Sequence, residues 1–181
     1  GLADVLAVLR SSEERNPEKL FLDIAKLPSV HMHGPEHHSI VPCVLLTAYR
    51  NNGGNIHLDD ALREAVRRGR QVPGGFCGFW GVCGAAAGAG ICASILLESG
   101  PLNAERWPIP QKLTARCLEN IASLGGPRCC KRTVRTAIKT AVEFTKEQTG
   151  IEMPSGGEAC SFSSENRECL RGKCPFYGKR G

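Results

Sequence analysis

The sequence predicts an all-α protein: a helical bundle with a glycine-rich central helix and an irregular, cysteine-rich C-terminal tail. Apolar residues recur at helical spacing through most of the 181 residues, and no segment alternates apolar and polar residues as a half-buried strand would. Pro and Gly residues stand at the ends of these periodic segments, where they act as start and stop signals. Three of the ten cysteines crowd into a polar stretch near the C-terminus, which carries no helical pattern.

The chain divides into three parts that we expect to form one compact domain. They are an N-terminal helical extension at 1–28, a helical core at 29–150 and a metal-binding tail at 151–181. In the extension, a helix is expected over 17–27, with Asn16 as its cap before Pro17.

The core contains five segments with helical periodicity, at 35–54, 58–75, about 81–97, 108–126 and 127–150. In the first of them, Pro42 follows Pro35 by seven residues and predicts a kink or a later helix start. In the glycine-rich segment, Gly84 and Gly88 lie four residues apart. They therefore share one helix face, which a neighbouring backbone can approach closely.

Residues 76–97 carry no charge and are long enough to span a bilayer. Gly, Ala and Cys dominate this run, however, so its insertion free energy would be small. We therefore expect a buried, closely packed helix and no association with a membrane.

Charge and cysteine content narrow the class of function. A net charge of +5 favours the approach of a small anion but falls short of a dedicated nucleic-acid binder. The N-terminal residues show no basic stretch followed by an apolar one, so no signal peptide is expected. The predicted location is therefore the cytoplasm, where cysteine clusters more often bind metal or do redox work than form disulfides.

The tail cysteines Cys160, Cys169 and Cys174 follow the spacing C-x8-C-x4-C, with a proline directly after the last of them. They stand among Ser, Asn, Glu, Arg and Lys, whereas packing cysteines stand among aliphatic residues. This pattern favours metal ligation over packing or a disulfide. An iron–sulfur cluster, 4Fe–4S in the simplest case, is preferred over zinc because the tail contains no histidine.

Four soft ligands are the usual requirement, and Cys129 and Cys130 are the candidates for the fourth. If a helix begins at Arg128, Cys130 faces the core. Cys129 then lies on a polar face near the positive end of the helix dipole, which favours a thiolate. Arg128 and Arg132 share a third, basic face. In the alternative interpretation, both cysteines are packing residues beneath this solvated basic face.

A second group of residues is suited to chemistry rather than ligation. Cys77 and Cys83 flank the glycine-rich approach to the central helix, and they could form a redox pair or belong to a second metal site. His37 and His38 follow Pro35 in the first turn of a helix, so only one ring is expected to reach a given pocket. Either histidine is suited to proton transfer or to hydrogen bonding at the helix start. The remaining cysteines, Cys43, Cys92 and Cys117, are expected in the core.

Four stretches resemble an uncharacterised cysteine-rich family, a domain of unknown function: HMHGPEHHSIVPCVLLTAYRNNGG, RGRQVPGGFCGFWGVCGAAAGAGI, GGPRCCKRT and CSFSSENRECLRGKCPFYG. Members occur alone in archaea and anaerobic bacteria, or fused to a small S-adenosylmethionine-dependent methyltransferase. The resemblance implies such a partner but no methyltransferase activity for this chain. A fainter similarity connects CGAAAGAGI and the later cysteine pair with a redox family named for its C-GCAxxG-C-C pattern.

These observations predict an iron–sulfur protein that carries out redox or sulfur-transfer chemistry on a small anionic substrate. Cys77 or Cys83 would act as the thiolate and His37 or His38 as the proton carrier. Arg128 and Arg132 would orient the anion. Two alternatives remain: a structural zinc module that docks a partner protein such as a methyltransferase, and a metal-free thiol redox enzyme. Whether the chain forms a homo-oligomer is left open.

Overall fold

The structure is a computed structural model that describes residues 2–178, so residues 1 and 179–181 at the outer ends of the expected extension and tail lie outside it. The described residues form eight α-helices, one short 3-10 helix and no strand, which confirms the all-α class. The α-helices are α1 (Ala3–Ser11), α2 (Pro17–Ile24), α3 (Glu36–Asn51), α4 (Leu58–Gly69), α5 (Phe76–Phe79), α6 (Gly84–Leu96), α7 (Pro108–Ser123) and α8 (Cys130–Thr149), and the 3-10 helix is η1 (Arg171–Lys173).

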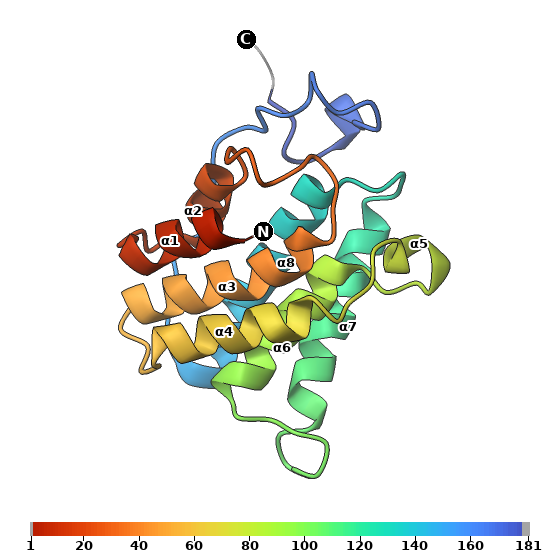
Figure 1. Ribbon diagram of the computed structural model, residues 1–181. Helices are drawn as coiled ribbons and strands as arrows, with labels where there is room; N and C mark the ends of the chain where they lie inside the picture. The colour runs from red at the N-terminus through yellow and green to blue at the C-terminus, as the bar shows by residue number, and fades with distance from the viewer. Residues whose placement is uncertain (1, 179–181) are drawn as a thin grey trace.

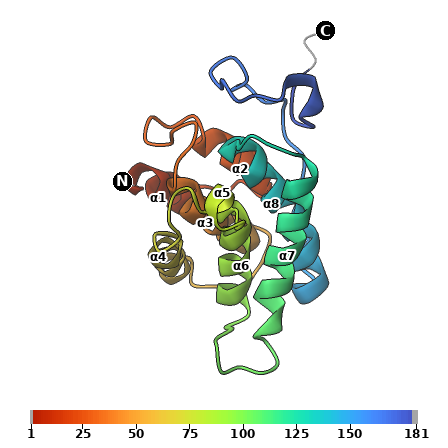
Figure 2. The ribbon, with the colours of Figure 1, turned by 90° about the vertical axis from the view of Figure 1, so that its right-hand side faces the viewer.

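Helices α3 and α6 form the centre of the bundle. Helix α3 contacts α1, α2, α4, α6 and α8, while α6 contacts α3, α4, α7 and α8. The tail that follows α8 returns to one end of the bundle, close to α2 and the start of α8 (Figures 1 and 2). The bundle therefore brings the C-terminal cysteines to the end where the two cysteines before and within α8 are located.

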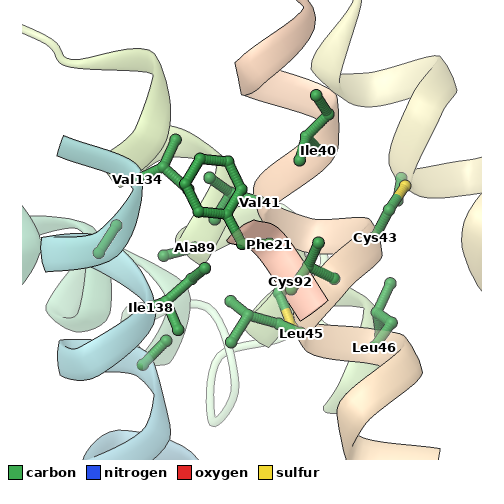
Figure 3. Packing of buried hydrophobic residues seen from close by; sticks show 14 of the residues in the cluster. Phe21, Ile40, Val41, Cys43, Leu45, Leu46, Ala89, Cys92, Val134 and Ile138 are labelled. Carbon is green, nitrogen blue, oxygen red and sulfur yellow. The ribbon is translucent and has the colours of Figure 1, made fainter. Parts of the chain in front are cut away.

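The hydrophobic core joins helices that are distant in sequence. Phe21 from α2, Leu45 from α3, Ala89 from α6 and Ile138 from α8 are all buried in it (Figure 3). Burial of a large apolar side chain contributes about 1.5–3 kcal/mol, so this shared core fixes α8 against α2 and α3. Within residues 2–178, none of the helices has the length and apolar character needed to cross a bilayer. The run at 76–97 accordingly forms α5, a loop and the whole of α6.

The expected close approach along the glycine-rich helix is confirmed. A Cβ on Gly88 would lie 2.9 Å from the His38 carbonyl oxygen and 3.0 Å from Pro42 Cδ. A Cβ on Gly84 would lie 2.0 Å from Cδ2 of the His38 ring. The two glycines therefore allow α6 to pack directly on α3, and they place the His38 ring against the first turn of α6.

Several helix ends lie at the predicted stop signals, since α4 ends at Gly69 and α8 ends at Thr149, directly before Gly150. The Asn16 cap is confirmed, since its side-chain oxygen accepts from the backbone N–H groups of Glu18 and Lys19 at 2.9 and 3.2 Å. Helix α3 starts at Glu36 and continues through Pro42, so no late start occurs. Helix α8 begins at Cys130 rather than near Arg128, because Cys129 adopts an extended conformation and its sulfur accepts from the Arg132 N–H.

Backbone hydrogen bonds hold the tail to itself and to α2. The Cys160 N–H donates to the Phe176 carbonyl oxygen at 2.7 Å, and Cys160 forms an isolated parallel bridge with Tyr177. The Asn16 side-chain amide donates to the Gly156 carbonyl oxygen at 2.7 Å. These contacts close the tail into a loop against the end of the bundle.

Candidate functional site: a sulfur cavity beside a thiol cleft

Four cysteines from two distant parts of the chain line one small cavity. Cys129 enters from the start of α8, and Cys160, Cys169 and Cys174 enter from the tail. We call this space the sulfur cavity. The structure thus gathers the three tail cysteines with one member of the Cys129–Cys130 pair.

Two of these sulfur atoms accept hydrogen bonds from N–H groups. Cys129 Sγ accepts from the Asn166 side-chain amide at 3.3 Å and from the Arg132 backbone N–H at 3.5 Å. Cys169 Sγ accepts from the Arg171 backbone N–H at 3.3 Å. Such bonds strengthen when the sulfur carries negative charge, and hydrogen bonds to ligand sulfurs tune the potential of a bound cluster.

Three cationic side chains also line the sulfur cavity, although none is exposed to solvent. Lys131, Arg132 and Arg135 are only 2%, 4% and 3% exposed. Within the described residues, two of their buried nitrogens, Arg132 Nε and Arg135 Nη1, have no hydrogen-bond partner. A buried charged group with unsatisfied donors is costly, so the cavity is electrostatically suited to an anionic occupant.

One carboxylate partly balances these cations. Glu18 of α2 is 1% exposed, and its Oε1 accepts from Arg135 Nε at 2.6 Å. Its other oxygen accepts from the Gly156 backbone N–H at 3.0 Å. Glu18 therefore fixes both the Arg135 guanidinium and the beginning of the tail.

The rest of the cavity wall is largely apolar. Leu22, Phe162 and Phe176 line it, together with Leu170 and Tyr177. The Arg135 guanidinium lies 4.2 Å from the centre of the Phe176 ring, and Lys131 Nζ lies 5.2 Å from that of Phe162. These aromatic rings cover the cations and exclude water from the space between the sulfurs.

The sulfur atoms surround the cavity without converging on one point. Within residues 2–178, no group of three or more His, Cys, Asp or Glu side chains is arranged to hold a single metal ion. Zinc requires four donors at about 2.0–2.3 Å from one centre.

A second, open space adjoins the sulfur cavity and has a volume of about 710 Å³. We call it the thiol cleft. Its lining includes every residue that the sequence suggested for chemistry or anion binding, namely Cys77, Cys83, His37, His38, Arg128 and Arg132, and also Cys130. The volume is within the range of about 300–1,000 Å³ that is typical of small-molecule sites.

The two cysteines at the start of α8 lie on different sides of the wall between these spaces. Cys129 is 7% exposed and faces the sulfur cavity, whereas Cys130 is half-buried and lines the thiol cleft. The expected polar face for Cys129 and core position for Cys130 are therefore both wrong. The cause is the later helix start, which makes Cys129 a cap with an extended backbone.

Two further expectations about α8 are corrected. Its basic face is only partly solvated, since the tail covers Arg132 and Arg135 while Arg128 stays exposed. Burial also raises the pKa of the Cys129 thiol, and the Arg132 N–H and charge offset only part of that effect. Burial likewise raises the pKa of Cys130. The core positions of Cys43, Cys92 and Cys117 are confirmed, because all three are buried.

His37 and His38 are both among the residues that line the thiol cleft, but their rings have different surroundings. His37 is 1% exposed, and both ring nitrogens are occupied: Nδ1 lies 3.0 Å from the Gly34 carbonyl oxygen and Nε2 lies 3.1 Å from Lys131 Nζ. The lysine can only donate, so Nε2 accepts and Nδ1 carries the proton. Burial first, and then the Lys131 charge, lower the pKa of His37 to about 4. His37 is therefore a neutral ring, and its Nε2 holds the Lys131 ammonium group in place.

This shift predicts a loss of stability in acid. The folded-state pKa of about 4 lies below the ordinary 6.5. The contribution of His37 to the free energy of unfolding is therefore complete above pH 6.5 and is lost as the pH falls toward 4. Glu36 opposes the shift and His38 adds to it. Between pH 7 and pH 5 the free energy of unfolding should fall by about 2 kcal/mol through this group. Urea unfolding of His37→Gln should show a correspondingly smaller pH dependence, with exposed His57→Gln as control. An unchanged slope in His37→Gln would contradict the assignment.

His38 has a different role, because one ring nitrogen remains available. Its Nδ1 lies 2.9 Å from the Val72 carbonyl oxygen, which requires the proton on Nδ1. Within the described residues, Nε2 forms no hydrogen bond, and the ring lies against Gly84, next to Cys83. Of the two histidines, His38 is therefore the one with a free basic nitrogen in the cleft.

Sequence reasoning did not identify Lys131, Arg135, Glu18 or Asn166 as site residues. The Glu18–Arg135 pair spans 117 positions, and nothing in either local pattern indicates burial. His33 also contacts the tail, because its Nε2 lies 3.2 Å from both Asn166 Oδ1 and Glu168 Oε2.

The comparisons with known proteins add a family but no activity. The model of a family of unknown function, DUF5714, matches residues 5–177. The chain belongs to this family. Neither the curated proteins nor the solved structures gave a match. Membership of DUF5714 therefore agrees with the resemblance to a domain of unknown function and assigns no activity to the cavity or the cleft.

Proposed function

We propose that this DUF5714 protein binds an iron–sulfur cluster in the sulfur cavity and carries out redox or sulfur-transfer chemistry on a small anionic substrate in the thiol cleft. The observation that carries the proposal is the combination of four cysteines and two unpartnered arginine nitrogens around one buried space. Cys129, Cys160, Cys169 and Cys174 would hold the cluster, 4Fe–4S in the simplest case.

The charge of the cavity supports this donor set. Three buried cations face one carboxylate, so the cavity wall carries an excess of two positive charges. A cluster bound by four thiolates is anionic and would balance this excess. Its sulfur atoms would also accept hydrogen bonds from Arg132 Nε and Arg135 Nη1. The aromatic and aliphatic wall would keep such a centre away from water.

A cluster supplies single electrons at a potential that its surroundings set. The protein contributes the cationic wall. The peptide bond between Cys129 and Cys130 connects the sulfur cavity to the thiol cleft. Arg128 provides a cationic group for an anionic substrate at the cleft.

Anaerobic purification followed by iron, sulfide and zinc assays tests this proposal. The expected protein is brown, contains about four iron and four sulfide per chain, and loses its visible absorption on oxidation. A colourless protein with stoichiometric zinc would contradict it and support a structural zinc module. A protein free of metal after anaerobic reconstitution would leave the cleft thiols as the only redox groups.

A further inference from the structure

The thiol cleft contains three cysteines with unequal surroundings. Cys83 is the residue before α6 and Cys130 is the first residue of α8, so both belong to packed helices. Cys77 is exposed on α5, a single turn between Gly75 and Gly81, which both have positive φ. We propose that Cys83 and Cys130 form a redox-active dithiol that reduces small anionic disulfides, with His38 as the proton acceptor of Cys83. This deepens the proposed function, since it names the thiols and the substrate class of that cleft.

Cys83 is the better nucleophile on geometric grounds. Within the described residues, no side chain caps the first turn of α6, and Gly84 and Ala85 of that turn line the cleft. The N–H groups of this turn would stabilise an anion beside Cys83, whether a thiolate or a leaving group. The half-buried position of Cys83 keeps its sulfur within reach of a substrate in the cleft.

His38 is placed to take the proton from Cys83. Its Nδ1–H donates to the Val72 carbonyl oxygen, which fixes the ring and leaves Nε2 as an acceptor. A Cβ on Gly84 would lie 2.2 Å from this Nε2, so the basic nitrogen lies over the residue next to Cys83. Glycine at position 84 is what makes this approach possible.

Cys130 approaches from the opposite element, since α8 and α6 pack against each other. Arg128 lies two residues earlier, is exposed, and forms no salt bridge within the described residues. The neighbouring Arg132 donates from Nη2 to the Gly125 and Pro127 carbonyl oxygens, so it is committed to the wall. Arg128 is therefore the cation available to an anionic substrate. This is why we infer that the substrate disulfide is negatively charged.

The proposed step balances without an electron from the sulfur cavity. His38 takes the Cys83 proton, and the thiolate attacks one sulfur of the substrate disulfide. The S–S bond breaks, and the first product leaves as a thiol with that proton. Cys130 then attacks the Cys83 sulfur, and its proton leaves with the second thiol product. The pair is oxidised by two electrons to a disulfide, and a dithiol reductant returns it to two thiols by the same exchange.

Glutathione disulfide, a small anionic disulfide, is the probe. Reduced wild-type protein should release two glutathione molecules per chain and form a Cys83–Cys130 disulfide. Chymotrypsin separates Cys77 from Cys83 because Phe79 and Trp80 lie between them, so non-reducing mass spectrometry can assign the bond. Cys130→Ser should stop at a glutathione adduct on Cys83 with one molecule released, and Cys83→Ser should not react.

His38→Gln keeps a donor for the Val72 carbonyl but removes the base, so adduct formation should slow by roughly 100-fold near neutral pH. A disulfide to Cys77, a Cys130→Ser protein that releases two glutathione molecules, or His38→Gln with the wild-type rate would overturn the inference. Iron is assayed on every sample. Dithiol chemistry without iron would refute only the cluster, and iron without the disulfide would refute only this inference.

Discussion

Replacing Cys129 with serine is expected to abolish cluster binding, whereas the same replacement at Cys130 should leave it intact. The two residues are adjacent, yet Cys129 faces the sulfur cavity and Cys130 faces the thiol cleft. Serine at position 129 loses the soft donor but remains a good N-cap for α8, so the helix start is kept. Bound iron in Cys129→Ser should fall at least about tenfold after anaerobic reconstitution.

Iron and sulfide assays, with the visible absorption spectrum, measure this difference, and circular dichroism checks that both variants stay helical. Because the two changes are chemically identical and one residue apart, a general effect on α8 would appear in both. Equal iron loss in the two variants, or full retention in Cys129→Ser, would contradict the assignment of the fourth ligand.

Glu18→Gln should give the largest loss of stability among single polar substitutions in this chain. The carboxylate is buried and accepts from Arg135 on one oxygen and from the Gly156 N–H on the other. Glutamine keeps the shape but removes the charge, which leaves the Arg135 guanidinium buried and uncompensated. The expected cost is about 3–5 kcal/mol of unfolding free energy.

Urea unfolding measures this cost, and Glu152→Gln provides the matched control. Glu152 pairs with Lys146 at 2.7 Å, but both side chains are exposed, so its loss should cost about 0–1 kcal/mol. Glu18→Gln should also make the tail around Gly156 more sensitive to limited proteolysis, because one of its anchors to α2 is weakened. A cost in Glu18→Gln as small as that of the control would show that Arg135 does not depend on this carboxylate.

The sequence was sufficient for six of the eight α-helices of the described residues because their determinants are local, whereas α1 and α5 were not predicted. Apolar spacing, the Asn16 cap and the terminal prolines and glycines act within a few residues of each helix. The close approach at Gly84 and Gly88 was also predictable, since two glycines on one helix face have no side chain to separate neighbours. Three tail cysteines in polar surroundings likewise stood out as a group.

The site residues around them could not be predicted in the same way. Arg132 and Arg135 read as a solvated basic face until the tail is seen to cover them, and Glu18 reads as an ordinary first-turn acid. The division between Cys129 and Cys130 depends on where α8 begins. A shift of two residues in the helix start decides whether Cys129 lies within the helix or precedes it as a cap. This in turn decides the direction in which its side chain points.

By itself, therefore, the sequence determined six of the helices, a glycine face on the central helix that a neighbouring backbone can approach, and the presence of three clustered tail cysteines. Only the tertiary structure decided that Cys129 joins them, that Cys130 lies in the neighbouring cleft, and that three buried cations surround the sulfurs. The physical reason is that helix formation depends on neighbours along the chain. The burial of the charged side chains and the approach of the four cysteines depend on the return of the tail to α2 and α8. The tail's hydrogen bonds to the start of α2 join residues that are more than a hundred positions apart.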